Sequence, residues 1–181
     1  MSRFVWFLVE TLGTLIACAS LLRALAWRAR VSPRDPVHRF VIAATDWIVK
    51  PLRRFLPPAG TLDLASLAAA ALSGLVTALA WALLLHGSEG ELALVVPMAL
   101  FLVLKWGLHL VMGLVLLQAI LSWVNPQAPV APTLDRLTQP FLAPLRNIVP
   151  LIGGVDLSPL VLLVLAQIAI ALLETLFLSI G

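Results

Sequence analysis

Apolar residues fill four long stretches of this chain, and polar residues, prolines and glycines gather between them. The stretches cover residues 4–27, 62–85, 101–124 and 157–180. Each is close to the ~20 residues that an α-helix needs to cross a bilayer. The pattern therefore predicts an all-α membrane protein with about four spanning helices joined by polar connectors.

The start of the third stretch is less clear than the others. Residues 92–124 are too long for one upright span, and Pro97 lies early in them. We expect a short interfacial or tilted segment first, followed by a spanning helix from about Phe101 to Val124.

The first connector, residues 28–60, predicts an amphipathic helix. Asp35 is a suitable N-cap, and the proline that follows it suits the first helical position. Aromatic and aliphatic side chains would face acyl chains and basic ones lipid phosphates. The helix should stop or kink before Pro51. The apolar face would hold Phe40, Val41, Ala44, Trp47 and Ile48, and the polar face Arg39, Asp46, Lys50 and Arg53.

The second connector, residues 125–154, predicts a shorter helix. Thr133 can cap a helix that runs to about Gln139, and Pro140 and Pro144 should then break it. Asp156 is the natural N-cap of the last span, as Asp63 is of the second span.

The two connectors share one spacing, which indicates an internal duplication. The alignment has no gaps, and it predicts two tandem helix–connector–helix repeats, residues 1–90 and 91–181. At a slightly different offset, Glu10 aligns with Lys105, Thr14 with His109 and Arg23 with Gln118. In the connectors, Thr45, Pro51, Leu52, Arg53, Pro57, Gly60, Asp63 and Leu64 align with Thr138, Pro144, Leu145, Arg146, Pro150, Gly153, Asp156 and Leu157.

The distribution of Arg and Lys among the loops predicts how the chain is oriented in the membrane. The first connector is rich in Arg and Lys, the second holds Arg136 and Arg146, and the turn at residues 87–90 has neither. The positive-inside rule then places both connectors in the cytoplasm and both termini outside. Anionic lipid head groups at the first connector are the nearest partner for its basic residues, and nucleic acid is not expected.

Composition supports lipid as the solvent and excludes several kinds of site. The chain is 61% hydrophobic and 12% charged, against ~45–50% and ~25% in soluble domains.

A lone cysteine, Cys18, excludes a disulfide framework and a Cys/His zinc site. A bis-histidine haem site would need His86 and His109 to meet. No catalytic motif occurs, so we expect no enzyme activity, cofactor or metal.

Three roles are open to Arg53 and Arg146, which precede the second helix of each repeat. Each guanidinium could anchor to lipid phosphate. Each could instead form an ion pair with Asp63 or Asp156 that folds the connector back on itself. An anion or ligand site is the third role. All three are structural or binding roles.

Polar residues inside the spans form a second set of candidates. An ionised group near mid-bilayer costs at least ~2.5–3.5 kcal/mol, so an unpaired charge is disfavoured. Either Lys105 pairs with a carboxylate, or these residues form a path that passes protons or ions. The set is Glu10, Arg23, Lys105, His109, Gln118, Gln167 and Glu174.

A ridge of small residues, Ala70, Gly74 and Ala78, predicts close helix packing. It could pack within the chain or form a homo-oligomer interface, and the sequence leaves both open.

The segments LLQAILSWVNPQAPV, LTQPFLAPLRNIVP and GGVDLSPLVLLVLAQ resemble the second domain of the YggT family, and residues 21–67 resemble its first. The resemblance adds Trp123, Asn125 and Pro126 to the connector motif. It implies a bacterial inner-membrane protein associated with osmotic or salt tolerance and potassium balance.

Two functions follow as hypotheses. One is a non-enzymatic organising or adaptor protein that binds unknown partners. The other is a small protein linked to potassium or proton transport.

Overall fold

The computed structural model describes residues 2–86, 93–149 and 156–179, and its regular structure there is helical. This confirms the predicted all-α class. The elements are α1 (Ser2–Arg28), α2 (Pro36–Arg53), α3 (Leu64–Trp81), the π-helical turn η1 (Ala82–His86), α4 (Val95–Val124), α5 (Ala131–Arg146) and α6 (Ser158–Leu178).

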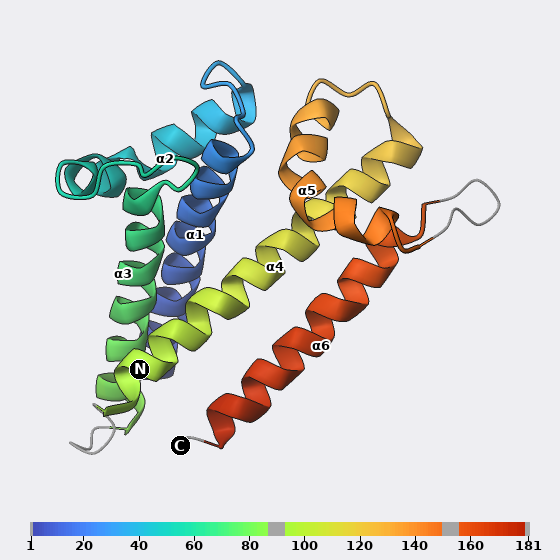
Figure 1. The fold of residues 1–181 in the computed structure, drawn as a ribbon. Coiled ribbons are helices and arrows are strands. Elements are labelled where there is room, and N and C mark those ends of the chain that lie inside the picture. The colour runs from blue at the N-terminus through green and yellow to red at the C-terminus, as the bar shows by residue number, and fades with distance from the viewer. Residues whose placement is uncertain (1, 87–92, 150–155, 180–181) are drawn as a thin grey trace.

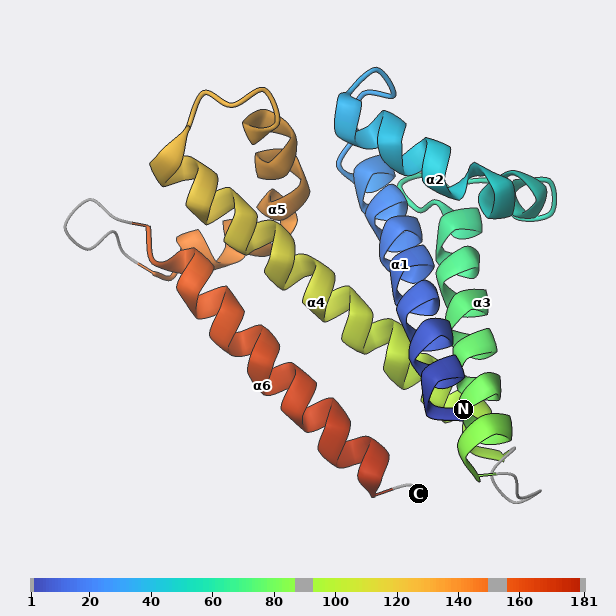
Figure 2. The ribbon, with the colours of Figure 1, turned by 180° about the vertical axis from the view of Figure 1, so that it is seen from behind.

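Four helices are long and apolar enough to cross a membrane: Arg3–Arg28, Leu64–Leu84, Val95–Val124 and Ser158–Leu178. Figure 1 shows α2 and α5 together at one end of these helices and both chain termini at the other end. Figure 2 shows the same arrangement from behind. The two connectors therefore lie on the same side of the molecule, as the duplication predicts.

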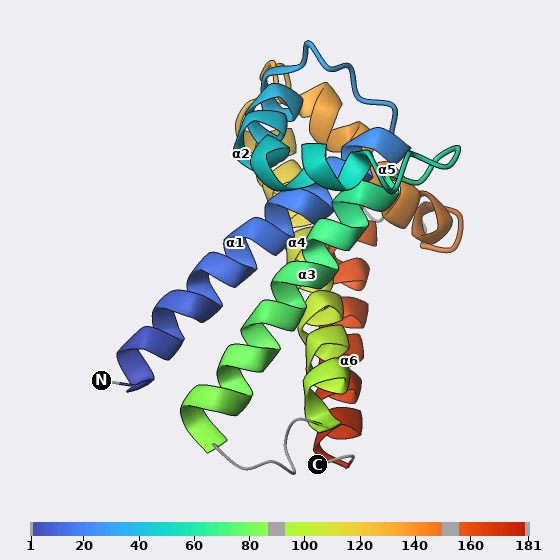
Figure 3. The ribbon, with the colours of Figure 1, turned by 90° about the vertical axis from the view of Figure 1, so that its left-hand side faces the viewer.

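The spans pack in the order α1, α3, α4, α6, and α1 also contacts α4. Figure 3 looks from the side of α1 and α3, with α4 and α6 behind them. α3 is thus central, whereas α6 lies at the edge and buries only Ser158 and Ala166. The equivalent helices of the two repeats therefore have different surroundings.

The small-residue ridge of α3 packs inside the chain. Ala70 and Ala78 are fully buried. A Cβ added to Gly74 would lie 3.0 Å from the carbonyl oxygen of Ala99 and 2.6 Å from a methyl of Val103, both on α4. Glycine is therefore what lets the two repeats approach each other, while a homo-oligomer stays a prediction.

The predicted breaks at Pro140 and Pro144 are wrong, and of the stop or kink predicted at Pro51 the stop does not occur. α2 continues through Pro51 to Arg53, and α5 continues through Pro140 and Pro144 to Arg146. A proline removes one backbone hydrogen bond and bends a helix without having to end it. Figure 1 shows α5 changing direction in its second half.

Three predicted helix starts need correction. α4 is one helix from Val95, and Pro97 lies in its first turn, where the missing N–H would have no intrahelical acceptor. Its 30 residues span about 45 Å at helical rise, more than the ~30 Å hydrocarbon core, and Figures 1 and 2 show α4 slanted. α5 has Val130, not Thr133, as its N-cap. α6 has Leu157 at that position, one residue after Asp156.

Substituting alanine for Gly74 tests the close approach of α3 and α4. Gly74→Ala should lower the thermal unfolding midpoint in detergent because overpacking costs about 1–3 kcal/mol. Gly113→Ala is the matched control, since its added Cβ would meet nothing within 4 Å. The control should be neutral or stabilising by up to about 1 kcal/mol. Equal effects of the two variants would contradict this packing.

Candidate functional site

Asp35 begins the first connector helix, as predicted. Its carboxylate accepts hydrogen bonds from the backbone N–H groups of Val37 at 2.9 Å and His38 at 3.3 Å. The predicted apolar face of α2 is only partly correct. Phe40 and Trp47 are exposed, whereas Val41 is buried on another face, where the helix packs against the spans.

An ion pair joins the end of α2 to the start of α3. Arg53 Nη2 lies 2.6 Å from Asp63 Oδ2, and Asp63 is 1% exposed. Asp63 also accepts hydrogen bonds from the N–H and hydroxyl of Ser66, at 3.4 and 2.7 Å. The carboxylate therefore caps α3, as predicted, and holds the connector at the same time.

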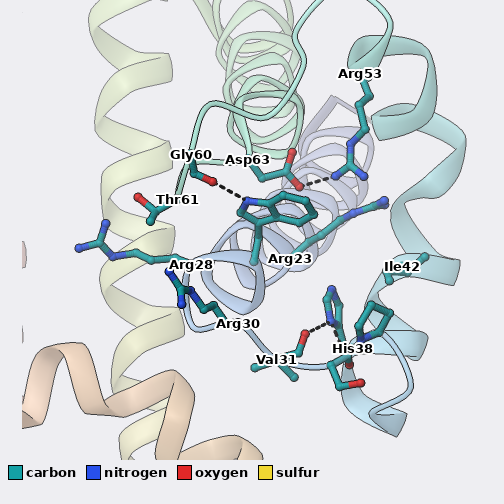
Figure 4. A pocket seen from close by; sticks show the side chains of 13 residues that line it. Arg23, Arg28, Arg30, Val31, His38, Ile42, Arg53, Gly60, Thr61 and Asp63 are labelled. Carbon is teal, nitrogen blue, oxygen red and sulfur yellow. Dashed lines mark hydrogen bonds and ion pairs between the residues drawn. The ribbon is translucent and has the colours of Figure 1, made fainter.

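An aromatic contact supports this ion pair. The Arg53 guanidinium lies 5.6 Å from the centre of the Trp27 ring. Trp27 Nε1 donates to the carbonyl oxygen of Gly60 at 3.3 Å, as Figure 4 shows. Gly60 has φ +58°, a left-handed conformation that favours glycine. Pro57 lies in the same stretch between α2 and α3.

The second repeat contains the same ion pair in a more open setting. Arg146 Nε lies 2.9 Å from Asp156 Oδ2, with the side chains 40% and 30% exposed. Asp156 also accepts a hydrogen bond from the Ser158 N–H at 2.9 Å. The predicted motif residues Pro150 and Gly153 lie outside the described residues, and Trp123, Asn125 and Pro126 lie where α4 ends.

Aligned polar residues of α1 and α4 attach each span to its own connector. Arg23, which is 4% exposed, donates to the Thr45 hydroxyl at 2.9 Å and lies 2.9 Å from Asp46 Oδ1. Gln118 accepts a hydrogen bond from the Thr138 hydroxyl and donates to Asp135 at 2.9 Å.

A hydrogen bond that the sequence did not predict joins the two connectors. The Thr133 hydroxyl donates to Asp35 Oδ2. Burial alone would raise the pKa of Asp35, but hydrogen bonds from Thr133 and from the backbone of His38 and Val37 outweigh it and lower that pKa. The residues lie far apart in sequence in unaligned positions, so no sequence signal could have indicated their contact.

The predicted intramembrane polar residues do not converge on one site. Lys105 on α4 forms an ion pair with Glu174 on α6 at 2.7 Å, with the side chains 32% and 44% exposed. His109 contacts the backbone oxygen of Lys105 at 2.8 Å. Gln167 is exposed on α6, and Glu10 lies near the far end of α1. Arg23 and Gln118 face the connectors instead, and ion conduction stays a prediction.

Within the described residues, no three His, Cys, Asp or Glu side chains form a group that could hold a metal ion. A bis-histidine haem site would need His86 and His109 to meet, and the His86 side chain lies outside the described residues.

A cavity of about 620 Å³ lies against the first connector and is lined by residues from α1, α2 and the loops beside them. Figure 4 shows its labelled side chains, which include Arg23, Arg28, Arg30 and Arg53 with Asp63. The sequence indicated a basic connector but not that its arginines share a cavity, because they lie on separate elements.

The two aligned ion pairs should differ in their contribution to stability. Arg53→Ala leaves a buried carboxylate without its partner. We expect a loss of about 2–3 kcal/mol, less than the ~3–5 kcal/mol of a fully buried pair because Arg53 itself is partly exposed. Arg146→Ala should cost about 0–1 kcal/mol. Denaturant unfolding of both variants in detergent checks this, and a larger loss for Arg146→Ala would overturn the assignment.

Acid should weaken the connectors. Hydrogen bonds and cations outweigh burial and lower the pKa values of Asp35, Asp46 and Asp156. A carboxylate whose pKa is lower in the folded state stabilises the fold at any pH above its unfolded-state pKa of ~3.9. This contribution is lost as the pH falls through the lower pKa of the folded state. The unfolding midpoint should therefore drop steeply below about pH 4.

Thr133→Val should make that drop shallower, because removing the hydroxyl raises the folded-state pKa of Asp35. Thr11→Val is the control, since the Thr11 hydroxyl bonds only within its own helix, to the Phe7 oxygen. A Thr133→Val profile that matches the control would count against the connector contact.

Comparison with known proteins places the chain among bacterial relatives. The CCB3/YggT family model matches residues 2–84 and 97–177. An "Uncharacterized protein in proC 3'region" of Vibrio alginolyticus is 36% identical over 90% of this chain and 89% of its own. An "Uncharacterized protein YggT" of Escherichia coli is 32% identical over 90% of this chain and 85% of its own. No solved structure matches. The family model covers most of both repeats, so this chain belongs to the CCB3/YggT family.

Proposed function

We propose that the protein is a non-enzymatic organising or adaptor protein of the bacterial inner membrane. The four apolar helices would hold it in the bilayer, and the two connectors would form one platform in the cytoplasm that contacts lipid and a partner protein. The observation that carries this proposal is that two polar residues of the spans, Arg23 and Gln118, bind the connectors. Each binds its own connector through a threonine, Thr45 or Thr138.

The exposed side of α2 supports the contact with lipid and partners. Phe40 and Trp47 are 74% and 64% exposed there, and Phe55 just beyond the helix is 83% exposed. Aromatic side chains beside basic ones are typical of helices that lie in a membrane interface. They are also typical anchors of protein interfaces.

A transport-linked function is the alternative, and the Lys105–Glu174 pair favours it. This pair lies within the spans and is partly exposed, as a group that exchanges protons or ions would be. A role in osmotic or salt tolerance is compatible with both proposals, since either a missing partner contact or a missing ion flux could impair growth at high salt.

Neutralising the Lys105–Glu174 ion pair tests which of the two functions the protein has. Lys105→Gln/Glu174→Gln should leave salt tolerance intact in a bacterial host without its own copy, because the adaptor does not use this pair. Purified protein in liposomes should pass no potassium or protons above empty liposomes. Selective flux that this double variant abolishes would reject the adaptor and support transport.

A photo-crosslinking amino acid tests the platform directly. Placed at Trp47, it should capture one saturable protein partner in cells. Placed at Leu172, which is 65% exposed on α6, it should capture none. Equal capture from both positions would mean that the connectors have no special role in partner binding.

A further inference from the structure

The cavity against the first connector is strongly basic. Four arginines line it, Arg23, Arg28, Arg30 and Arg53, and Asp63 is the one carboxylate among the lining residues. Its volume of about 620 Å³ falls within the ~300–1,000 Å³ that is usual for small-molecule sites. Figure 4 shows Arg28 and Arg30 on one side of the cavity and Arg23 and Arg53 on the other.

Two of these arginines are already engaged and two are not. Arg23 binds Thr45 and Asp46, and Arg53 binds Asp63. Across residues 2–86, 93–149 and 156–179, the guanidinium groups of Arg28 and Arg30 make no hydrogen bond or ion pair. Arg53 Nε is buried and also lacks a hydrogen-bond acceptor. The cavity therefore has donors in excess of its acceptors.

The backbone holds Arg30 in a conformation that arginine seldom adopts. Arg30 has φ +52° and follows the last turn of α1. Its N–H bonds to the Trp27 oxygen at 3.1 Å, and the Val31 N–H bonds to the Ala26 oxygen at 2.9 Å. Glycine is the usual residue at this point of such a helix end. An arginine in this position is explained if its side chain binds a ligand in the cavity.

The remaining walls are mostly apolar, with Trp27, Val31, Pro33 and Ile42 among them. His38 fixes the loop, since its ring Nδ1 donates to the Val31 oxygen at 3.0 Å. A small inorganic ion would leave this apolar surface uncovered. A phosphate that carries a glycerol or acyl portion would cover it.

We propose that this cavity binds a phosphate group, with the Arg28 and Arg30 guanidinium groups as its donors. Guanidinium groups suit phosphate because their planar fork matches two oxygens at once. The phosphate could belong to the head group of an anionic phospholipid or be free in solution. The lipid source rests on the proposed placement of the connectors at the membrane surface.

Lipid binding to the full chain in detergent tests the proposal. Native mass spectrometry would titrate phosphatidylglycerol, with phosphatidylcholine as the comparison lipid. Arg28→Ala/Arg30→Gly should weaken phosphatidylglycerol binding about tenfold or more, since it removes two charge-assisted contacts. Arg34→Ala/Arg54→Ala removes the same charge from two arginines that are exposed, as Arg28 and Arg30 are, but lie outside the cavity. It should change binding less than about twofold.

The variant at Arg30 is expected to fold, because glycine suits its left-handed backbone. Arg30→Gly alone should unfold at or above the wild-type temperature while still weakening binding. Equal weakening by the cavity and control variants, or none in the cavity variant, would overturn the site.

Inorganic phosphate distinguishes the two sources. Displacement of phosphatidylglycerol by millimolar phosphate identifies a site for any phosphate group. Lipid binding that resists phosphate but depends on Arg28 and Arg30 identifies a head-group site. The assay uses neither a partner protein nor ion flux, so its failure would leave the adaptor proposal standing.

Discussion

A buried carboxylate at the start of α3 is the constraint on which the first repeat depends. Asp63 is 1% exposed, and an ionised group so placed is stable only with a cation and hydrogen-bond donors. Arg53 and Ser66 supply them. Since Arg53 is the last residue of α2, satisfying the carboxylate also fixes the connector on the central span. Trp27 completes the arrangement by tying α1 to the same guanidinium and to the loop before α3.

The sequence predicted the parts of this fold that depend on local pattern and on duplication. Apolar runs located the spans because lipid requires them. The aligned spacing placed Arg53 and Arg146 the same distance before Asp63 and Asp156, and both ion pairs occur. The helix ends predicted at the prolines failed for a physical reason. Whether a proline ends a helix or bends it depends on the tertiary contacts that hold the following turn, and a single sequence does not contain them.

Burial was the other property that the sequence could not supply. The aligned ion pairs have the same chemistry, but α3 lies between α1 and α4 while α6 lies at the edge. The first pair is therefore enclosed by helices and the second is not. The Asp35–Thr133 bond shows the same limit, because it depends on how the repeats sit against each other. Duplication fixes the bonds inside each repeat and leaves the contact between repeats undetermined.

The repeats also differ at the end of their first helix, where the basic cavity lies. After Trp27 the chain continues with Arg28, Ala29 and Arg30, whereas after Trp123 it continues with Val124, Asn125 and Pro126. Proline is locked near φ −65°, so Pro126 cannot adopt the left-handed conformation that Arg30 has. The second helix end therefore lacks both the two arginines and the left-handed residue that follows the first helix. If one repeat binds phosphate at the membrane surface, the chemistry of these two helix ends assigns that role to the first, and the second connector, tied to the first through Thr133 and Asp35, is left to serve a different contact.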